Sequence, residues 1–282
     1  MGSRKPLGGS LGGVCVLASV LIAPAHVLAE PVPAGSEPPA RSQMALPTRL
    51  VPTTVARYPH DRAAFTQGLL FHQGWLYEST GLRGRSSLRR VDISNGKADK
   101  RRDLPSALFG EGLARVEDRL IQLTWTSGIA RVYSLSDFTL TGVHRYRGEG
   151  WGLCFDGELL VMSDGSHQLS FRDPTTFEVV RTIEVRSPAG PVSRLNELEC
   201  RGRHVYANVW GSWRIVEIDK YSGNLVADID ASDLMTAEEK RSLPSGAVLN
   251  GIAYDPTNDT FLITGKLWPT MYRVRFTPPA TK

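Results

Sequence analysis

Five short segments of this chain align with one another and recur at intervals of roughly 40 to 54 residues. Each segment starts with a polar or aromatic residue and continues as a strand-like run, and a second strand-like run follows it. The segments are residues 67–71, 111–115, 151–155, 196–200 and 250–254. Repetition at this interval is typical of radial arrays such as the β-propeller, in which each repeat forms one small sheet. The repeat therefore predicts an all-β fold.

Each repeat contains about four strand-like runs rich in β-branched and aromatic residues. In the first repeat these runs are 68–71, 75–79, 87–92 and 97–103. The fifth repeat ends after its third run, whereas residues 49–58, before the first repeat, are also strand-like. Because a ring loses its open edges when one end of the chain completes the last sheet, we expect 49–58 to be the outer strand of the last blade. The predicted domain is a five-bladed β-propeller over residues 48–278, with four strands per blade.

One insertion interrupts the spacing between the fourth and fifth repeats. Residues 232–243 begin with Ser232 and continue as a mixture of Leu, Met, acidic and basic residues. Serine is a favourable N-cap, so this segment predicts one short helix.

The N-terminal region is predicted to lie outside the fold. Arg4 and Lys5 precede an apolar run from residue 7 to about residue 28, which ends in a small-residue cleavage pattern at Ala29. This pattern is typical of a secretory signal peptide, residues 1–29, and an uncleaved membrane anchor is the alternative. A Pro-rich linker, 30–47, follows it. We therefore expect a periplasmic or secreted protein, without a membrane attachment once the signal is cleaved.

Charge gives little indication of a macromolecular partner. The chain carries 33 basic and 29 acidic side chains, a net charge of +4. Removal of the leader takes away Arg4 and Lys5, which halves that excess. No run of Lys or Arg with interleaved aromatic residues occurs, so nucleic acid is not an expected partner. We expect a monomer.

Two cysteines remain after the predicted cleavage. Cys154 and Cys200 lie one register apart on the aligned first strands of neighbouring repeats, so they face opposite sides of their sheets. Opposite faces of neighbouring blades meet, and an exported protein permits a disulfide there. The alternative is two small buried thiols.

The first residues of the five segments are candidates for a site, because the same position of every propeller repeat points to one shared place. They are Gln67, Glu111, Trp151, Asn196 and Asn250. The second runs end near this place with Trp125, Trp210 and Lys266. Three indoles at one end of a ring are typical of a pocket for a small apolar or flat group.

The polar residues of this set indicate proton transfer beside an oxygen that gains charge. Glu111 is the only acid among the five first positions, and burial between indoles is expected to raise its pKa, whereas Lys266 acts in the opposite direction. Such a carboxylate can exchange a proton near neutral pH. The amides of Gln67 and Asn196 and the ammonium of Lys266 can donate hydrogen bonds to an oxyanion. The set fits acyl-transfer or amide chemistry. No serine-nucleophile motif and no metal-ligand spacing occurs, so no metal or cofactor is expected.

Several motifs together carry a resemblance to a known family. They are FTQGL (65–69), FGEGL (109–113), GWGL (150–153), LNELE (195–199), LNGI (249–252) and the pair Gly265-Lys266. From about residue 50 to 276 the chain resembles, in order and in spacing, the plant and bacterial type of glutaminyl-peptide cyclotransferase, or glutaminyl cyclase.

The resemblance implies a five-bladed propeller that acts on peptides or proteins with an N-terminal glutamine. The implied reaction converts that glutamine to pyroglutamate and releases ammonia. It further implies that Glu111 is the catalytic acid and base. The positions that it assigns to the pocket are Phe65, Gln67, Phe109, Trp125, Trp151, Asn196, Trp210 and Lys266. Among these, we expect Asn196 and Lys266 to stabilise the oxyanion.

Two alternatives remain at this point. A calcium-dependent lactonase or esterase propeller also places Glu and Asn side chains around an axis, although calcium usually takes several carboxylates. A non-catalytic propeller could instead bind peptides or sugars through its tryptophans.

Overall fold

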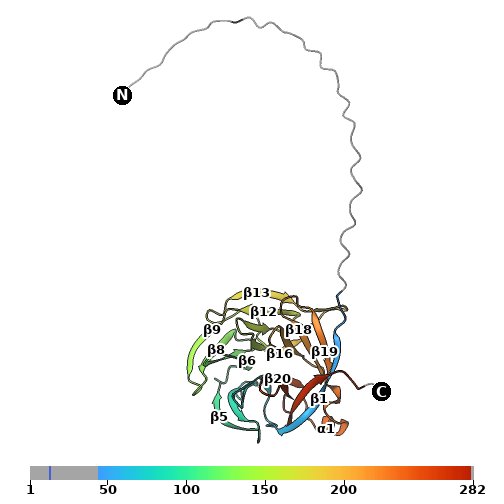
Figure 1. Ribbon diagram of the computed structural model, residues 1–282. Helices are drawn as coiled ribbons and strands as arrows, with labels where there is room; N and C mark the ends of the chain where they lie inside the picture. The colour runs from blue at the N-terminus through green and yellow to red at the C-terminus, as the bar shows by residue number, and fades with distance from the viewer. Residues whose placement is uncertain (1–12, 14–43, 281–282) are drawn as a thin grey trace, which may run out of the picture. The chain divides into compact units, whose positions relative to one another are not determined.

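The computed structural model describes Gly13 and residues 44–280 of the chain. The regular secondary structure of residues 44–280 is almost entirely β-strand, and the strands form sheets that follow one another along the chain (Figure 1). The first four-stranded sheet contains β2 (Thr66–His72), β3 (Trp75–Thr80), β4 (Ser87–Asp92) and β5 (Lys97–Asp103). The second contains β6 (Gly110–Val116), β7 (Arg119–Thr124), β8 (Ile129–Ser134) and β9 (Leu140–Arg145). The third contains β10 (Leu153–Phe155), β11 (Leu160–Ser163), β12 (Gln168–Arg172) and β13 (Val179–Glu184).

The remaining long strands form one eight-stranded sheet in the order β16-β17-β18-β19-β1-β22-β21-β20. Its members are β16 (Leu195–Arg201), β17 (His204–Val209), β18 (Arg214–Asp219), β19 (Leu225–Asp230), β20 (Leu249–Asp255), β21 (Thr260–Gly265), β22 (Thr270–Thr277) and β1 (Thr48–Pro59). A two-residue pair, β14 (Arg186–Ser187) and β15 (Gly190–Pro191), lies between β13 and β16.

Strand β1 joins the two ends of the domain. From Val51 to Pro59 it pairs antiparallel with β22, and its first residues, Thr48 to Leu50, pair parallel with β19. The expectation that residues 49–58 form the outer strand beside the last repeat is confirmed. The parallel pairing with β19 was not expected, and it is the reason why the last two groups of four strands merge into one sheet.

The first strands of the groups contact one another in a closed cycle. β2 contacts β6, β6 contacts β10, β10 contacts β16, β16 contacts β20, and β20 contacts β2. In Figure 1, β6, β16 and β20 lie toward the middle, whereas β5, β9, β13 and β1 lie toward the outside. The arrangement is all-β, with almost no helix, and is consistent with a propeller-like fold.

Glycines permit this close approach of first strands. A Cβ added to Gly68 would lie 2.5 Å from the Leu113 nitrogen, and one added to Gly112 would lie 2.4 Å from the Leu153 nitrogen. A Cβ on Gly152 would lie 2.0 Å from the Asn196 carbonyl oxygen. These distances are shorter than any side chain tolerates, so the backbones pack directly against each other.

The fourth repeat has Glu197 where the other repeats have glycine. Its side chain is fully buried. One carboxyl oxygen accepts a hydrogen bond from the Leu69 N–H at 3.1 Å, and the other accepts one from the Ile252 N–H at 2.7 Å. Glu197 on β16 therefore links β2 and β20 at the centre of the cycle of first strands.

The insertion before β20 differs from the predicted single helix over 232–243. It contains a 3₁₀ turn, η1 (Ser232–Leu234), and a short helix, α1 (Ala237–Arg241). The buried Met235 separates them in an extended conformation. Ser232 does not cap the helix; Thr236 does, in a reciprocal capping box with Glu239. The prediction was wrong about continuity because burial of Met235 interrupts the helical backbone.

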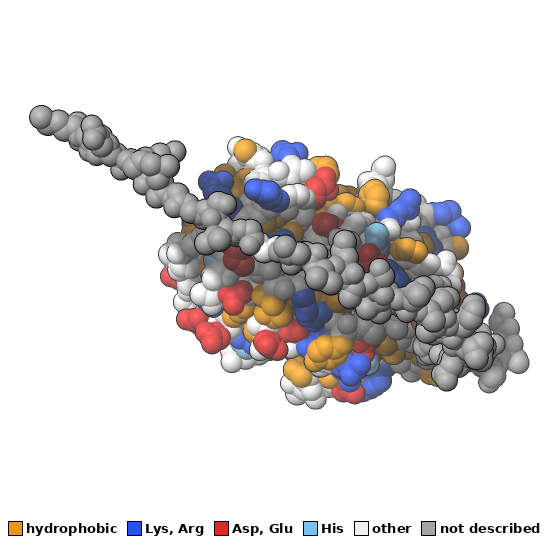
Figure 2. Space-filling model, turned by 90° about the horizontal axis from the view of Figure 1, so that it is seen from above, with side chains coloured by type: hydrophobic (Ala, Val, Ile, Leu, Met, Phe, Trp, Pro, Cys, Tyr) orange, Lys and Arg blue, Asp and Glu red, His pale blue; other side chains and the backbone are white. Residues whose placement is uncertain are grey.

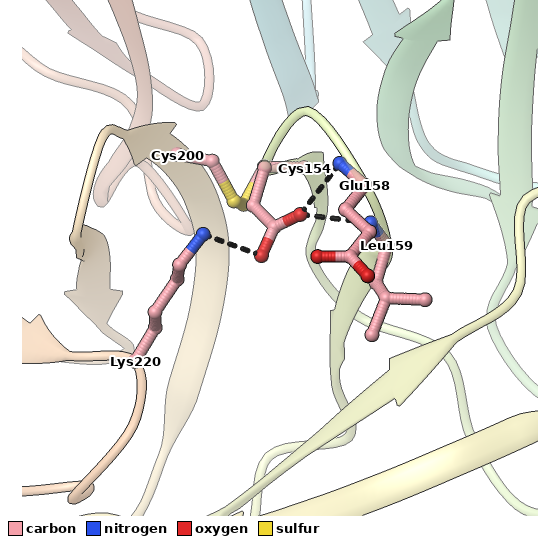
Figure 3. Close-up of a disulfide and its surroundings, with 6 residues drawn as sticks. Cys154, Glu158, Leu159, Cys200 and Lys220 are labelled. Carbon is pink, nitrogen blue, oxygen red and sulfur yellow. Dashed lines mark hydrogen bonds and ion pairs between the residues drawn. A yellow bond between two sulfur atoms is a disulfide. The ribbon is translucent and has the colours of Figure 1, made fainter.

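A disulfide joins Cys154 on β10 to Cys200 on β16, with their Cα atoms 5.5 Å apart (Figure 3). The two alternatives left open by the sequence are resolved in favour of this bond. Beside it, the Lys220 ammonium pairs with the Asp156 carboxylate at 2.8 Å. Two neighbouring sheets are therefore held by a covalent bond and an ion pair.

Lys, Arg, Asp and Glu side chains are intermixed on the face seen in Figure 2. Among residues 44–280, no helix is long and apolar enough to cross a membrane. Apart from Gly13, the predicted signal peptide (1–29) falls outside the described residues, as does the predicted linker (30–47) up to residue 43.

Candidate active site

A cavity of about 380 Å³ opens at one end of the first strands. Its walls are formed by Phe65, Gln67, Phe109, Glu111, Trp125, Trp151, Asn196, Trp210 and Lys266. The sequence predicts these same nine residues, and the structure brings all of them together. Asn250, the fifth residue of the aligned set, does not reach the cavity and lies buried behind Gln67.

β-bulges lie at the first residues of four repeats, and three of these residues, Gln67, Glu111 and Asn196, reach the cavity. The register of β2 with β3 shifts between Thr66 and Gly68, which flank Gln67. Equivalent shifts occur around Glu111 in β6, Asn196 in β16 and Asn250 in β20. A bulge leaves a residue unpaired and turns its side chain away from the regular alternation. The repeated bulge thus explains why one aligned position supplies the polar groups of the cavity.

Aromatic rings form most of the wall by edge-to-face contacts. Phe65 and Phe109 have ring centroids 6.1 Å apart, and Phe109 and Trp125 are 5.6 Å apart. On the other side, Trp151 and Trp210 are 5.8 Å apart at an interplanar angle of 80°. Trp210 is 43% exposed, so it lies at the mouth. Such a wall fits a flat or apolar group and reduces the access of water.

Glu111 is the buried acid of the cavity, and its side chain is held by an amide chain. The Gln67 Nε2 donates to the Glu111 Oε1 at 2.9 Å. The Asn250 Nδ2 donates to the Gln67 Oε1 at 3.2 Å and to the Thr66 carbonyl oxygen at 2.9 Å. Gln67 was expected to line the pocket and to be able to donate to an oxyanion; it lines the cavity, and because one of its N–H groups is engaged by Glu111, it also orients the acid.

Burial raises the pKa of Glu111 well above its usual value, and the positive charge of Lys266 acts in the opposite direction. Burial also lowers the pKa of Lys266 to about 8, although Glu111 counteracts this effect. The Lys266 Nζ lies 4.9 Å from the centre of the Phe65 ring, where the ring face attracts a cation. The cavity therefore holds an acid and an amine that both exchange protons closer to neutral pH than usual.

Asn196 presents a polar group that the protein does not satisfy. Its Oδ1 is buried and has no hydrogen-bond partner within the described residues 44–280. An unpaired buried acceptor carries a free-energy cost of about 1–3 kcal/mol, which a bound donor would relieve. The amide is thus available to a ligand in the cavity.

The sequence missed a second carboxylate, Glu149. Its Oε2 accepts hydrogen bonds from the indole N–H groups of Trp125 and Trp151, at 2.6 and 2.8 Å. Glu149 lies in the loop before β10, outside the aligned positions. The only signal in the sequence is its place between two glycines, directly before the GWGL motif.

Within residues 44–280, no three His, Cys, Asp or Glu side chains are grouped as a metal site would need. The cavity itself offers one carboxylate next to an ammonium group, which is a poor set of ligands for calcium.

The chain is similar to known cyclotransferases over nearly all of the described domain. The model of the glutamine cyclotransferase family matches residues 26–276. A glutaminyl-peptide cyclotransferase from Arabidopsis thaliana is 39% identical over 230 residues, which are 81% of this chain and 72% of that protein. The crystal structure of Myxococcus xanthus glutaminyl cyclase superposes with a TM-score of 0.78 at 41% identity, over 83% of this chain and all of that chain. The chain therefore belongs to the glutamine cyclotransferase family.

Proposed function

We propose that this protein is a glutaminyl-peptide cyclotransferase, which converts the N-terminal glutamine of peptides or proteins to pyroglutamate and releases ammonia. The observation that carries the proposal is the buried Glu111, oriented by Gln67 inside an aromatic cavity. The two relatives of 39% and 41% identity bear names that describe the same activity.

The fold that supports this activity is a five-bladed propeller over residues 48–278. The closed cycle of contacts among β2, β6, β10, β16 and β20 supports five blades. In this arrangement β1 is the outer strand of the blade formed by β20, β21 and β22.

The first step is attack of the substrate α-amine on its own γ-carboxamide carbon. A peptide α-amine has a pKa of about 7.7–8.0, so it is partly protonated at neutral pH. Glu111, whose pKa is raised by burial, accepts a proton from the nitrogen as the new C–N bond forms. The carbonyl oxygen takes the negative charge. The Lys266 ammonium and the Asn196 amide are the groups of the cavity that can donate to it.

The second step expels ammonia. Glu111 returns the proton to the departing nitrogen, the original C–N bond breaks, and the carbonyl is restored in a five-membered lactam. Because the nucleophile and the carbonyl belong to one residue, holding that glutamine in a folded conformation supplies much of the rate. The indoles of Trp125 and Trp151 restrict the space to a folded glutamine.

Release of ammonia from a Gln-initiated peptide by the purified protein tests the proposal, with the N-acetylated peptide as the unreactive control. Glu111→Gln should lower kcat by a factor of about 100 or more, because the proton acceptor is lost. Glu158→Gln, in an exposed turn, is the matched control and should leave kcat unchanged. Near-normal turnover in Glu111→Gln refutes the role of Glu111.

The same assay separates the alternatives. Loss of activity on exhaustive chelation would favour the calcium-dependent hydrolase. Quenching of tryptophan fluorescence by the peptide, without ammonia, would favour a binding propeller.

We also propose that the protein is exported to the periplasm or the medium and acts as a monomer. The Cys154–Cys200 disulfide supports an oxidising compartment. Cell fractionation and the mass in solution test the two parts of this proposal.

A further inference from the structure

Glu149 connects two walls of the cavity that come from different sheets. Trp125 directly follows β7 in the second sheet, and Trp151 precedes β10 in the third. One oxygen of Glu149, Oε2, accepts the indole N–H of both, at 2.6 and 2.8 Å. Hydrogen bonds to a carboxylate are stronger than neutral ones, and two of them to one oxygen fix the relative orientation of the two rings.

The loop that carries Glu149 is braced against Trp125. The Gly150 N–H donates to the Trp125 carbonyl oxygen at 3.0 Å. A Cβ on Gly150 would lie 2.3 Å from the Tyr146 hydroxyl oxygen, and that hydroxyl donates to the Thr124 carbonyl. On the other side, Gly148 has a φ of +81°, which favours glycine. These contacts define the backbone on both sides of Glu149, so its carboxylate is preorganised.

The loop of Glu149 lies next to the strand of Glu111, because the Gly112 N–H donates to the Trp151 carbonyl oxygen at 2.7 Å. Glu149 therefore also acts on the buried acid through space. Its negative charge raises the pKa of Glu111, in the same direction as burial and opposite to Lys266. The residue is only partly buried, so solvent weakens this effect.

We propose that Glu149 is a positioning residue of the site. Its carboxylate fixes the orientation of the indoles of Trp125 and Trp151, and it also places a negative charge close to Glu111. The role in the reaction rests on the proposed cyclisation, whereas the locking of the indoles does not.

Two substitutions separate the two effects. Glu149→Gln keeps an oxygen that can accept from both indoles but removes the charge. We expect its KM to stay within about twofold of wild type, because one carbonyl oxygen has two lone pairs. We expect the acid limb of its kcat profile, which reports the base in the bound complex, to move to lower pH. Glu149→Ala removes the acceptor as well, and its KM should rise about tenfold as the indoles lose their orientation.

A measurement that does not depend on activity accompanies the kinetics. Near-UV circular dichroism reports the fixed environment of tryptophans, and we expect a changed spectrum for Glu149→Ala and a wild-type spectrum for Glu149→Gln. Far-UV spectra and the Tm establish that each variant is folded. If the alanine variant does not fold, the glutamine variant still tests the electrostatic part. Glu158→Ala serves as the surface control.

The proposal is overturned if folded Glu149→Ala has the KM and the near-UV spectrum of the wild type, or if Glu149→Gln has an unchanged pH profile. If the wild-type protein releases no ammonia, the proposed function fails, and the near-UV spectra still decide whether Glu149 locks the indoles.

Discussion

Substitution of Glu197 by alanine is expected to destabilise the ring, although Glu197 itself does not line the cavity. Glu197 replaces the glycine of the other repeats, and its carboxyl group is the acceptor for the N–H groups of Leu69 and Ile252. Leu69 lies on β2, Ile252 on β20 and Glu197 on β16, and these strands belong to three different groups of four strands. β2 and β20 are edge strands of their sheets, and these two N–H groups are directed at Glu197, so truncation leaves both of them buried without this acceptor.

The magnitude follows from those two donors. Each buried N–H that loses its partner costs about 1–3 kcal/mol, which gives about 2–6 kcal/mol for the pair. Burial raises the pKa of Glu197 well above its usual value even though both N–H groups lower it, so the carboxyl itself is costly to bury. Removal of the carboxyl group eliminates the free-energy cost of burying it, which offsets part of the destabilisation caused by the two unpaired N–H groups. We therefore expect a net decrease of about 2–3 kcal/mol in the free energy of unfolding.

Urea unfolding of wild type, Glu197→Ala and Glu197→Gln measures this decrease. The glutamine variant keeps one acceptor and should lose less than the alanine variant. Glu158→Ala, in an exposed turn, should stay within about 0.5 kcal/mol of wild type. A loss below about 0.5 kcal/mol for Glu197→Ala, with an unchanged m-value, would refute the reasoning, because it would mean that the two N–H groups find water or new partners at the axis.

Two further predictions concern stability. Burial raises the pKa of Glu199 to about 8, so its contribution to stability is complete below its unfolded pKa of about 4.3 and is lost as the pH rises through 8. The urea midpoint should fall between pH 5 and 9, and less so in Glu199→Gln; an identical slope in both proteins would contradict this. The Cys154–Cys200 disulfide closes a loop with a sequence separation of 46, and its chain entropy corresponds to about 4 kcal/mol. The double serine variant should therefore unfold at lower urea, whereas reductant should have no effect on that variant.

The strands and the cavity residues were predictable because the repeat ties sequence position to position in space. Once the segments align, the first residue of each is directed to one place, whatever its chemistry. The rule gave Gln67, Glu111, Trp151 and Asn196 correctly. The rule failed for Asn250, which is buried behind Gln67. The repeat predicts the direction in which a side chain points, but not whether the side chain reaches the cavity.

Contacts made outside the period were not predictable. Glu149 lies in a connecting loop, and its function depends on where two indole edges from different sheets meet. The break in the inserted helix depends on the burial of Met235, which is a property of the folded core. The hydrogen bond from Gln67 to Glu111 likewise was not predictable, because it depends on the distance between two neighbouring first strands.

Closure of the ring and assembly of the site depend on adjacent residues. At three of the bulges, one residue turns into the cavity and the next packs against the neighbouring first strand, as Gln67 and Gly68 do. In the fourth repeat the pair is Asn196 and Glu197, so the amide available to the ligand sits next to the carboxyl that links β2 and β20. Loosening of the axis at Glu197 should thus also displace Asn196. A rise in KM in Glu197→Ala, measured far below its unfolding transition, would reveal that coupling.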